Sequence, residues 1–139
     1  VGDIDRSVLN RIEQAKNVEW RGFVDEDEKF ELLARCSAVV FNGRNEDFGI
    51  VPIEANASGK PVVSRDDGFP GMFVDEGTNG VLHDGTEQDI KQAITRLREM
   101  DLLVQSRTHV TPFTTDSFLE ELRNIISYEY TQIHKYVNI

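Results

Sequence analysis

The sequence has little of what marks several large classes of protein. It contains a single cysteine, Cys36, among 139 residues, so no internal disulfide can form and a reducing cytoplasm is the expected location. No apolar run approaches the roughly 20 residues that a membrane-spanning helix needs. The three histidines and the one cysteine show no metal-ligand spacing, so we predict no bound metal and no cofactor.

Positive charge is also scarce. The chain carries 15 Lys and Arg residues against 25 Asp and Glu residues, for a formal net charge of −10. Nucleic-acid binding requires a basic surface that neutralises phosphates, so a nucleic-acid partner is excluded. The remaining composition, with 39% apolar and 29% charged residues, is that of a soluble globular protein about one domain long.

Short apolar runs alternate with helical periodicity along the first hundred residues. The runs 38–41 (AVVF) and 61–64 (PVVS) predict strands that are buried on both faces of a parallel sheet. The segments 18–24 and 81–83 predict two further strands, and a Gly-rich loop is expected after 61–64. Helices are expected at residues 5–16, 25–36, 52–58, 86–99, 102–107 and 115–135.

This order predicts an α/β fold, in which a Rossmann-like parallel sheet lies between helices. A helical tail of about residues 100–139 follows, and we expect a single domain over 1–139. An apolar stripe along the tail is interpreted as core, and it consists of Phe118, Leu119, Leu122, Ile125 and Ile126.

Local signals predict where several helices begin and end. Asp25 is a good N-cap with Glu28 three residues later, and Thr86 is a second candidate cap. Pro52 suits the first position of a helix, and Gly59 suits the left-handed residue just past its end.

The segment 42–54 (NGRNEDFGIVPIE) lies between a predicted strand and a predicted helix. In open α/β sheets, ligands bind beyond the carboxyl ends of the strands. With Pro52 at the start of the helix, the amides of Gly49, Ile50 and Val51 are expected to face outward. Unpaired amides and the positive end of the helix dipole favour a phosphate group there.

Two acidic residues frame these amides, Glu46 before them and Glu54 in the predicted first turn. Carboxylates accept hydrogen bonds from hydroxyl groups, which a sugar or a ribose supplies in pairs, so the segment suggests a nucleotide-sugar site. Other interpretations stay open. An acid near a helix start stabilises the helix by about 0.3–1 kcal/mol without any ligand. Phe48, taken alone, favours a plug in the core over a wall of the site.

Residues 46–55 (EDFGIVPIEA), followed by 57–63 (ASGKPVV), resemble the signature of glycosyltransferase family 4, with its mannosyltransferase-like members closest in form. That family has the GT-B fold, and its enzymes retain the anomeric configuration of the transferred sugar. The segments 17–24, 33–38 and 79–82 also resemble the family. The resemblance implies that this chain is the carboxyl-terminal, nucleotide-sugar-binding half of such an enzyme.

The resemblance also implies a role for each matching residue. Glu46 would hold hydroxyls of the transferred sugar and lie nearest the chemistry, and Glu54 would hold the ribose hydroxyls of the donor. The donor-binding residues implied in addition are Phe48, Gly49 and Ile50 at the sugar and diphosphate, and Gly22, Phe23 and Val24 at the base. No metal is implied, because helix amides and cations can stabilise the leaving diphosphate.

The sequence departs from the family in two ways. Asp67 and Gly71 occupy places where the family usually has a glycine and a glutamate. Residues 1–3 look like the end of a strand, so the family's basic pair would lie upstream. Arg44, Lys60 and Arg65 are the nearest cations, and each is interpreted as a surface charge.

The family's enzymes also need an amino-terminal domain that carries the acceptor site, so we expect this chain alone to be inactive and to require that domain or a partner chain. Two alternatives remain open at this point. The chain could be a nucleotide-sugar-binding or partner-binding module without catalysis, or a flavodoxin-like receiver or mononucleotide domain, which the strand and helix order permits.

Overall fold

The computed structural model describes residues 6–100 and 106–137 of the chain. The chain divides into an amino-terminal unit, residues 1–35, and a carboxyl-terminal unit, residues 36–139. The expected helix at 102–107 lies mostly outside the described residues, as does the strand end expected at 1–3.

The described residues of the amino-terminal unit form helices α1 (Arg6–Gln14) and α2 (Glu26–Arg35). Asp25 caps α2 as predicted, because its Oδ1 accepts a hydrogen bond of 2.9 Å from the Glu28 amide. The strand predicted at 18–24 is wrong. These residues pair with no strand among the described residues, and Gly22 turns the backbone with a left-handed φ of +64°.

The carboxyl-terminal unit is built on a parallel sheet of three strands in the order β1-β2-β3. These strands are β1 (Val39–Phe41), β2 (Val62–Arg65) and β3 (Gly80–His83). The helical segments are α3 (Ile50–Ala57), α4 (Gly68–Phe73), α5 (Glu87–Arg98), the 3-10 helix η1 (Ser106–Phe113) and α6 (Thr115–Val137). The predicted α/β sheet with a helical carboxyl-terminal region is confirmed.

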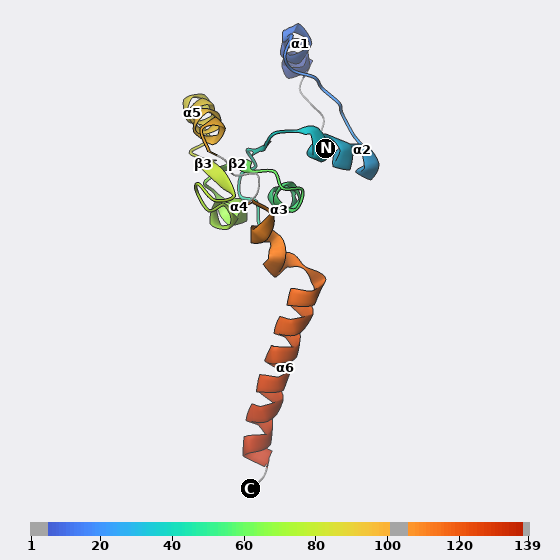
Figure 1. Ribbon diagram of the computed structural model, residues 1–139, viewed down its shortest axis with the longest axis vertical. Helices are drawn as coiled ribbons and strands as arrows, with labels where there is room; N and C mark the ends of the chain where they lie inside the picture. The colour runs from blue at the N-terminus through green and yellow to red at the C-terminus, as the bar shows by residue number, and fades with distance from the viewer. Residues whose placement is uncertain (1–5, 101–105, 138–139) are drawn as a thin grey trace. The chain divides into compact units, whose positions relative to one another are not determined.

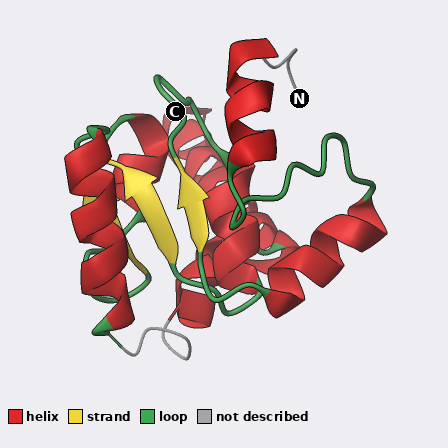
Figure 2. Cartoon of the chain, turned by 90° about the horizontal axis from the view of Figure 1, so that it is seen from above, coloured by secondary structure: helices red, strands yellow, loops and turns green. Residues whose placement is uncertain are grey.

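The sheet lies between α5 on one side and α3 and α4 on the other (Figures 1 and 2). Val63 of β2 and Val81 of β3 are fully buried against Ala93 and Leu97 of α5. The apolar spacing of α5 therefore predicted its buried face correctly. The carboxyl ends of the three strands meet at one edge, because Phe41 pairs with Ser64 and Arg65 pairs with His83.

Three further predictions are wrong. β1 is not buried on both faces, since it is an edge strand and Val40 is 52% exposed, whereas α5 packs on β2 and β3. The expected Gly-rich loop after β2 contains the short helix α4, which Pro70 and Phe73 anchor by packing. The apolar stripe of α6 is not core, because every one of its five residues is at least 37% exposed.

No helix in the described ranges is both long and apolar enough to cross a membrane.

Candidate functional site

Helix α3 begins at the carboxyl edge of the sheet, a few residues after β1. Its N-cap is Gly49, which has φ 59° and ψ 75° and makes no side-chain capping bond. A side chain at this position would be strained by the left-handed backbone and would approach Glu46 Cγ and Pro70 Cγ at 3.0 Å each. Glycine therefore lets the loop pass closely over the start of the helix.

The start of α3 differs from the prediction, because Pro52 is its third residue and not its first. Proline is still accommodated, since no amide in the first turn has an acceptor within the helix. The predicted consequence holds: the amides of Gly49, Ile50 and Val51 have no hydrogen-bond acceptor among the described residues. Three donors thus remain available at the positive end of the α3 dipole.

The far end of α3 is fixed by backbone hydrogen bonds. The Gly59 amide donates to Asn56 O at 2.8 Å, and the Lys60 amide donates to Ala55 O at 2.9 Å, which is the Schellman pattern. The fully buried Asn56 also donates from Nδ2 to Asn79 O at 3.2 Å, just before β3. Gly59 therefore ends the helix as predicted, and α3 is held firmly against the sheet.

Glu46 lies beside the start of α3. Its Cγ lies against the Gly49 backbone, and its Oε2 lies near Gly43, 3.6 Å from the place that a Cβ on Gly43 would occupy. Its backbone carbonyl accepts a hydrogen bond of 3.1 Å from the Phe69 amide of α4. The structure thus brings Glu46 together with Gly49, as the sequence predicted, and holds both from the side of α4.

Glu54 lies one turn further along α3, four residues after Ile50, and is partly buried. The sequence predicted it in the first turn, but α3 has no acidic residue there. The stabilising effect of the helix dipole on an acidic residue falls off within the first turn. Stabilisation of the helix is therefore a weaker explanation for an acid at position 54 than it was with the predicted helix start.

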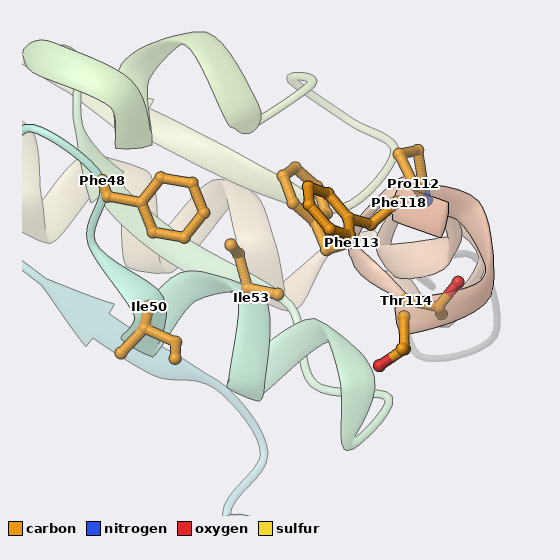
Figure 3. A pocket seen from close by; sticks show the side chains of 8 residues that line it. Phe48, Ile50, Ile53, Pro112, Phe113, Thr114 and Phe118 are labelled. Atoms are coloured by element: carbon orange, nitrogen blue, oxygen red, sulfur yellow. The ribbon is translucent and has the colours of Figure 1, made fainter. Parts of the chain in front are cut away.

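Phe48 is not a core plug, since it is 53% exposed. Its ring stacks on Phe69 at 4.9 Å, and the cluster extends to Phe73 and Phe113 through ring contacts of 5.4–5.9 Å. Beside it lies a hollow of about 420 Å³, lined by Phe48, Ile50, Ile53, Pro112, Phe113, Thr114, Thr115 and Phe118. Figure 3 shows Ile53 between Phe48 on one side and Phe113 on the other.

Sequence reasoning missed the turn that precedes α4. Asp67 Oδ2 accepts a hydrogen bond of 3.4 Å from the Asn45 amide, and its carboxylate lies 3.7 Å from Arg65 Nε. Arg65 is consequently not the surface charge that we predicted, because its side chain is 18% exposed and paired. The departure of Asp67 from the family pattern was a signal from which this turn could have been found.

His83 is a second residue that the sequence did not single out. It ends β3, is 2% exposed, and its Nδ1 accepts a hydrogen bond of 3.0 Å from the Gly85 amide. Burial lowers the pKa of His83, and the positive charge of Arg65 acts in the same direction against the raising effect of Asp89. The imidazole is therefore neutral near pH 7, with its proton on Nε2.

The residues expected at the nucleotide base, Gly22, Phe23 and Val24, lie between α1 and α2 in the amino-terminal unit. Phe23 is 78% exposed. Their role at a base stays a prediction. Across the described ranges, 6–100 and 106–137, no group of three or more His, Cys, Asp and Glu side chains is arranged to hold a metal ion.

Comparisons with known proteins agree with the fold and with the motif. The chain is 31% identical over 113 residues to the human alpha-1,3/1,6-mannosyltransferase ALG2, a match that covers 77% of this chain and 27% of that protein. Its identity to ALG2 of Dictyostelium discoideum is 32% over 74 residues, covering 53% and 18% of the two chains. The chain thus spans less than a third of the length of these relatives.

Among solved structures, Anabaena Alr3699/HepE in complex with UDP and glucose shares the fold, with a TM-score of 0.65 and 22% identity. The likeness covers 88% of this chain and 35% of that one. Residues 8–113 match the family described as glycosyl transferases group 1. That match spans most of the chain and includes the loop at the start of α3. The chain therefore belongs to the glycosyl transferases group 1 family.

Proposed function

We propose that this chain binds the nucleotide-sugar donor of a retaining hexosyltransferase, with the diphosphate at the start of α3. The observation that carries the proposal is the set of three unpaired amides at Gly49, Ile50 and Val51. A helix start with unpaired donors attracts a phosphate group through hydrogen bonds and through the dipole. The solved relative Alr3699/HepE, which shares the fold, was crystallised with UDP and glucose.

The two acids act on hydroxyl groups in this proposal. Glu46, beside Gly49, holds hydroxyls of the transferred sugar and is the residue nearest the chemistry. Glu54, partly buried one turn into α3, holds the ribose hydroxyls. Phe48 and Ile50 border the same loop and contact the sugar and the diphosphate.

Departure of the diphosphate needs positive electrostatic potential, and the amides at the start of α3 supply it. The proposed reaction consequently needs no metal ion or other cofactor. We also propose a cytoplasmic location, for which the lone Cys36 is the supporting observation.

The transfer reaction itself belongs to the whole protein in this proposal. The chain covers 27% of human ALG2, so a further domain or a partner chain would supply the acceptor site. If the chain is instead a binding module without catalysis, transfer will be measurable only after a second polypeptide is added. Sugar transfer by the 139-residue chain alone would contradict both versions.

Calorimetric titration of the chain with UDP, GDP and ADP tests the donor site. We expect one of the three to bind, and we expect Glu54→Ala to weaken it by about 10–100-fold, as the loss of hydrogen bonds to a charged group predicts. The matched control is Glu87→Ala, which removes the same charge from the exposed first turn of α5 and leaves the affinity unchanged. No binding by the folded chain, or an unchanged affinity in Glu54→Ala, contradicts the proposal.

A further inference from the structure

The loop that carries Glu46 takes its shape from contacts with the turn at 66–70, which includes the first residues of α4. The Asn45 amide donates to Asp67 Oδ2 at 3.4 Å, and the Phe69 amide donates to Glu46 O at 3.1 Å. Phe48 stacks on Phe69 with ring centroids 4.9 Å apart. Contacts from the same turn thus hold three positions of the loop, although the two segments are about 20 residues apart in sequence.

The backbone of Asn45 has an unfavourable conformation that the contact with Asp67 helps to hold. Its φ of +50° makes it the one non-glycine residue with a left-handed backbone within the described part of the chain. That conformation is unfavourable for a residue with a side chain, although asparagine tolerates it better than most. Asn45 directly precedes Glu46, so its backbone sets the direction in which the Glu46 side chain leaves the loop.

The carboxylate of Asp67 is itself oriented. Arg65 Nε lies 3.7 Å from Asp67 Oδ2, and the Arg65 side chain is largely buried at the end of β2. The guanidinium packs over Gly85, where a Cβ would overlap its Nη1 atom. Asp67 Oδ2 therefore faces both the Arg65 guanidinium and the Asn45 amide.

The residue after Asp67 shows how closely the two segments approach. Gly68 has a φ of +59°, and a Cβ there would overlap the carbonyl oxygen of Glu46. No other residue type fits without a shift of the Glu46 backbone. The turn at 66–70 and the loop at 42–49 are therefore packed tightly against each other. A substitution at Asp67 is expected to move the backbone of Glu46.

We propose that Asp67 is a positioning residue, which acts through Asn45 to set the place of the Glu46 carboxylate beside the start of α3. The consequence for binding rests on the function proposed above: Asp67 governs recognition of the sugar, which Glu46 contacts, and not of the diphosphate, which the α3 amides bind. Asp67 itself touches neither group.

The first test needs no ligand. In amide NMR spectra of the chain, Asp67→Ala is expected to shift the Asn45 and Glu46 resonances and to speed exchange of the Asn45 amide. Val81 and Ala93 in the core serve as internal references. Asp67→Asn retains an acceptor oxygen for the Asn45 amide and should restore most of the exchange protection. Unchanged Asn45 and Glu46 resonances in Asp67→Ala overturn the proposal.

The second test compares two probes by calorimetry: the nucleoside diphosphate that binds among UDP, GDP and ADP, and its glucose or mannose conjugate. Asp67→Ala is expected to weaken the conjugate by about fivefold more than the bare diphosphate. In a Glu46→Ala background the same substitution should have no further effect, because Asp67 acts through Glu46. Equal weakening of both probes, or an undiminished effect in that background, overturns the proposal.

The two tests separate the two proposals. If no nucleotide binds the folded wild-type chain, the proposed function fails, and the amide spectra still decide whether Asp67 positions Glu46. If Asp67→Ala does not fold, as judged by its thermal unfolding curve, Arg65→Ala replaces it. This substitution removes the cation that orients Asp67 and must still shift the Glu46 resonance for the proposal to stand.

Discussion

Helices α5 and α3 begin at the same edge of the sheet, yet their starts are built in opposite ways. At α5, Thr86 Oγ1 accepts a hydrogen bond of 3.2 Å from the Asp89 amide, and two acidic residues occupy the first turn. At α3, Gly49 offers no side chain, and no acid occupies the first turn. The sequence thus caps one helix start with a side chain and leaves the amides of the other without an acceptor among the described residues.

The difference extends to the residues before each helix. Ahead of α5, the Asp84 amide donates to Asp89 Oδ2 at 2.8 Å, and the Thr86 amide donates to Asp84 Oδ1 at 2.7 Å. The hydrogen bonds from Thr86 to the Asp84 carboxylate lower the pKa of Asp84. Ahead of α3, the loop is held from outside, by the turn at 66–70. A binding site is compatible with the second arrangement, because its donors stay unpaired.

The largest expected effect comes from filling the space between Gly68 and Glu46. Gly68→Ala should lower the free energy of unfolding by about 2–3 kcal/mol, because it adds a clash with the Glu46 carbonyl to a strained left-handed backbone. Gly77→Ala is the matched control, since Gly77 is also left-handed but nothing lies within 4 Å of its added Cβ. Gly77→Ala should cost about 1 kcal/mol. Equal losses in urea unfolding would show that the loop and the turn do not approach closely.

The next effect concerns the cap of α5. Thr86→Ala removes the acceptor for the Asp89 amide and should lower the free energy of unfolding by about 1 kcal/mol. Nucleoside diphosphate affinity should not change, because α5 takes no part in the proposed site. A loss of affinity comparable to that of Glu54→Ala would contradict the contrast between the two helix starts.

His83 makes the free energy of unfolding depend on pH. Its pKa in the folded chain lies below the ordinary value of 6.5, so well above pH 6.5 the ring is neutral in both states and contributes no pH dependence to the free energy of unfolding. As the pH falls below 6.5, the unfolded chain binds a proton that the folded chain excludes. The free energy of unfolding therefore decreases until the pH passes below the folded pKa.

The variant His83→Asn tests this dependence. Asparagine keeps an acceptor for the Gly85 amide and cannot be protonated, so this part of the slope should disappear. Thermal unfolding between pH 5 and 7 measures the slope in both chains. Identical slopes would mean that His83 titrates alike in the folded and unfolded states.

The smallest expected effect is no effect at all. Because the α3 amides supply the positive potential in our proposal, nucleoside diphosphate affinity should be the same in EDTA and in millimolar Mg²⁺. Calorimetry in the two buffers measures this. An affinity that falls more than about tenfold in EDTA would assign part of the diphosphate binding to a metal ion.

What the sequence predicted well depends on local signals. Thr86 and the apolar spacing after it predicted α5 and its buried face, and the run 61–64 predicted the central strand. Gly59 predicted the end of α3, because a left-handed stop needs no distant partner. Within the candidate site, a contiguous motif was enough to single out Glu46 and Glu54.

What the sequence did not predict depends on contacts between distant segments. Residues 18–24 alternate like a strand, but a strand needs a neighbour with which to pair. Helix α3 begins two residues earlier than the sequence predicted, because Gly49, held between Glu46 and Pro70, takes the cap position. The contact between Asn45 and Asp67 spans 22 residues and leaves no periodic trace in the sequence.

The most direct test of the account follows the amides of Gly49, Ile50 and Val51 by NMR as the nucleoside diphosphate is added, with the bare nucleoside as control. We predict that these three resonances shift downfield with the diphosphate and not with the nucleoside, while the Asp89 amide, already bonded to Thr86, stays in place. Shifts at α5 with none at α3, or equal shifts with the bare nucleoside, would contradict the assignment of the diphosphate to the start of α3.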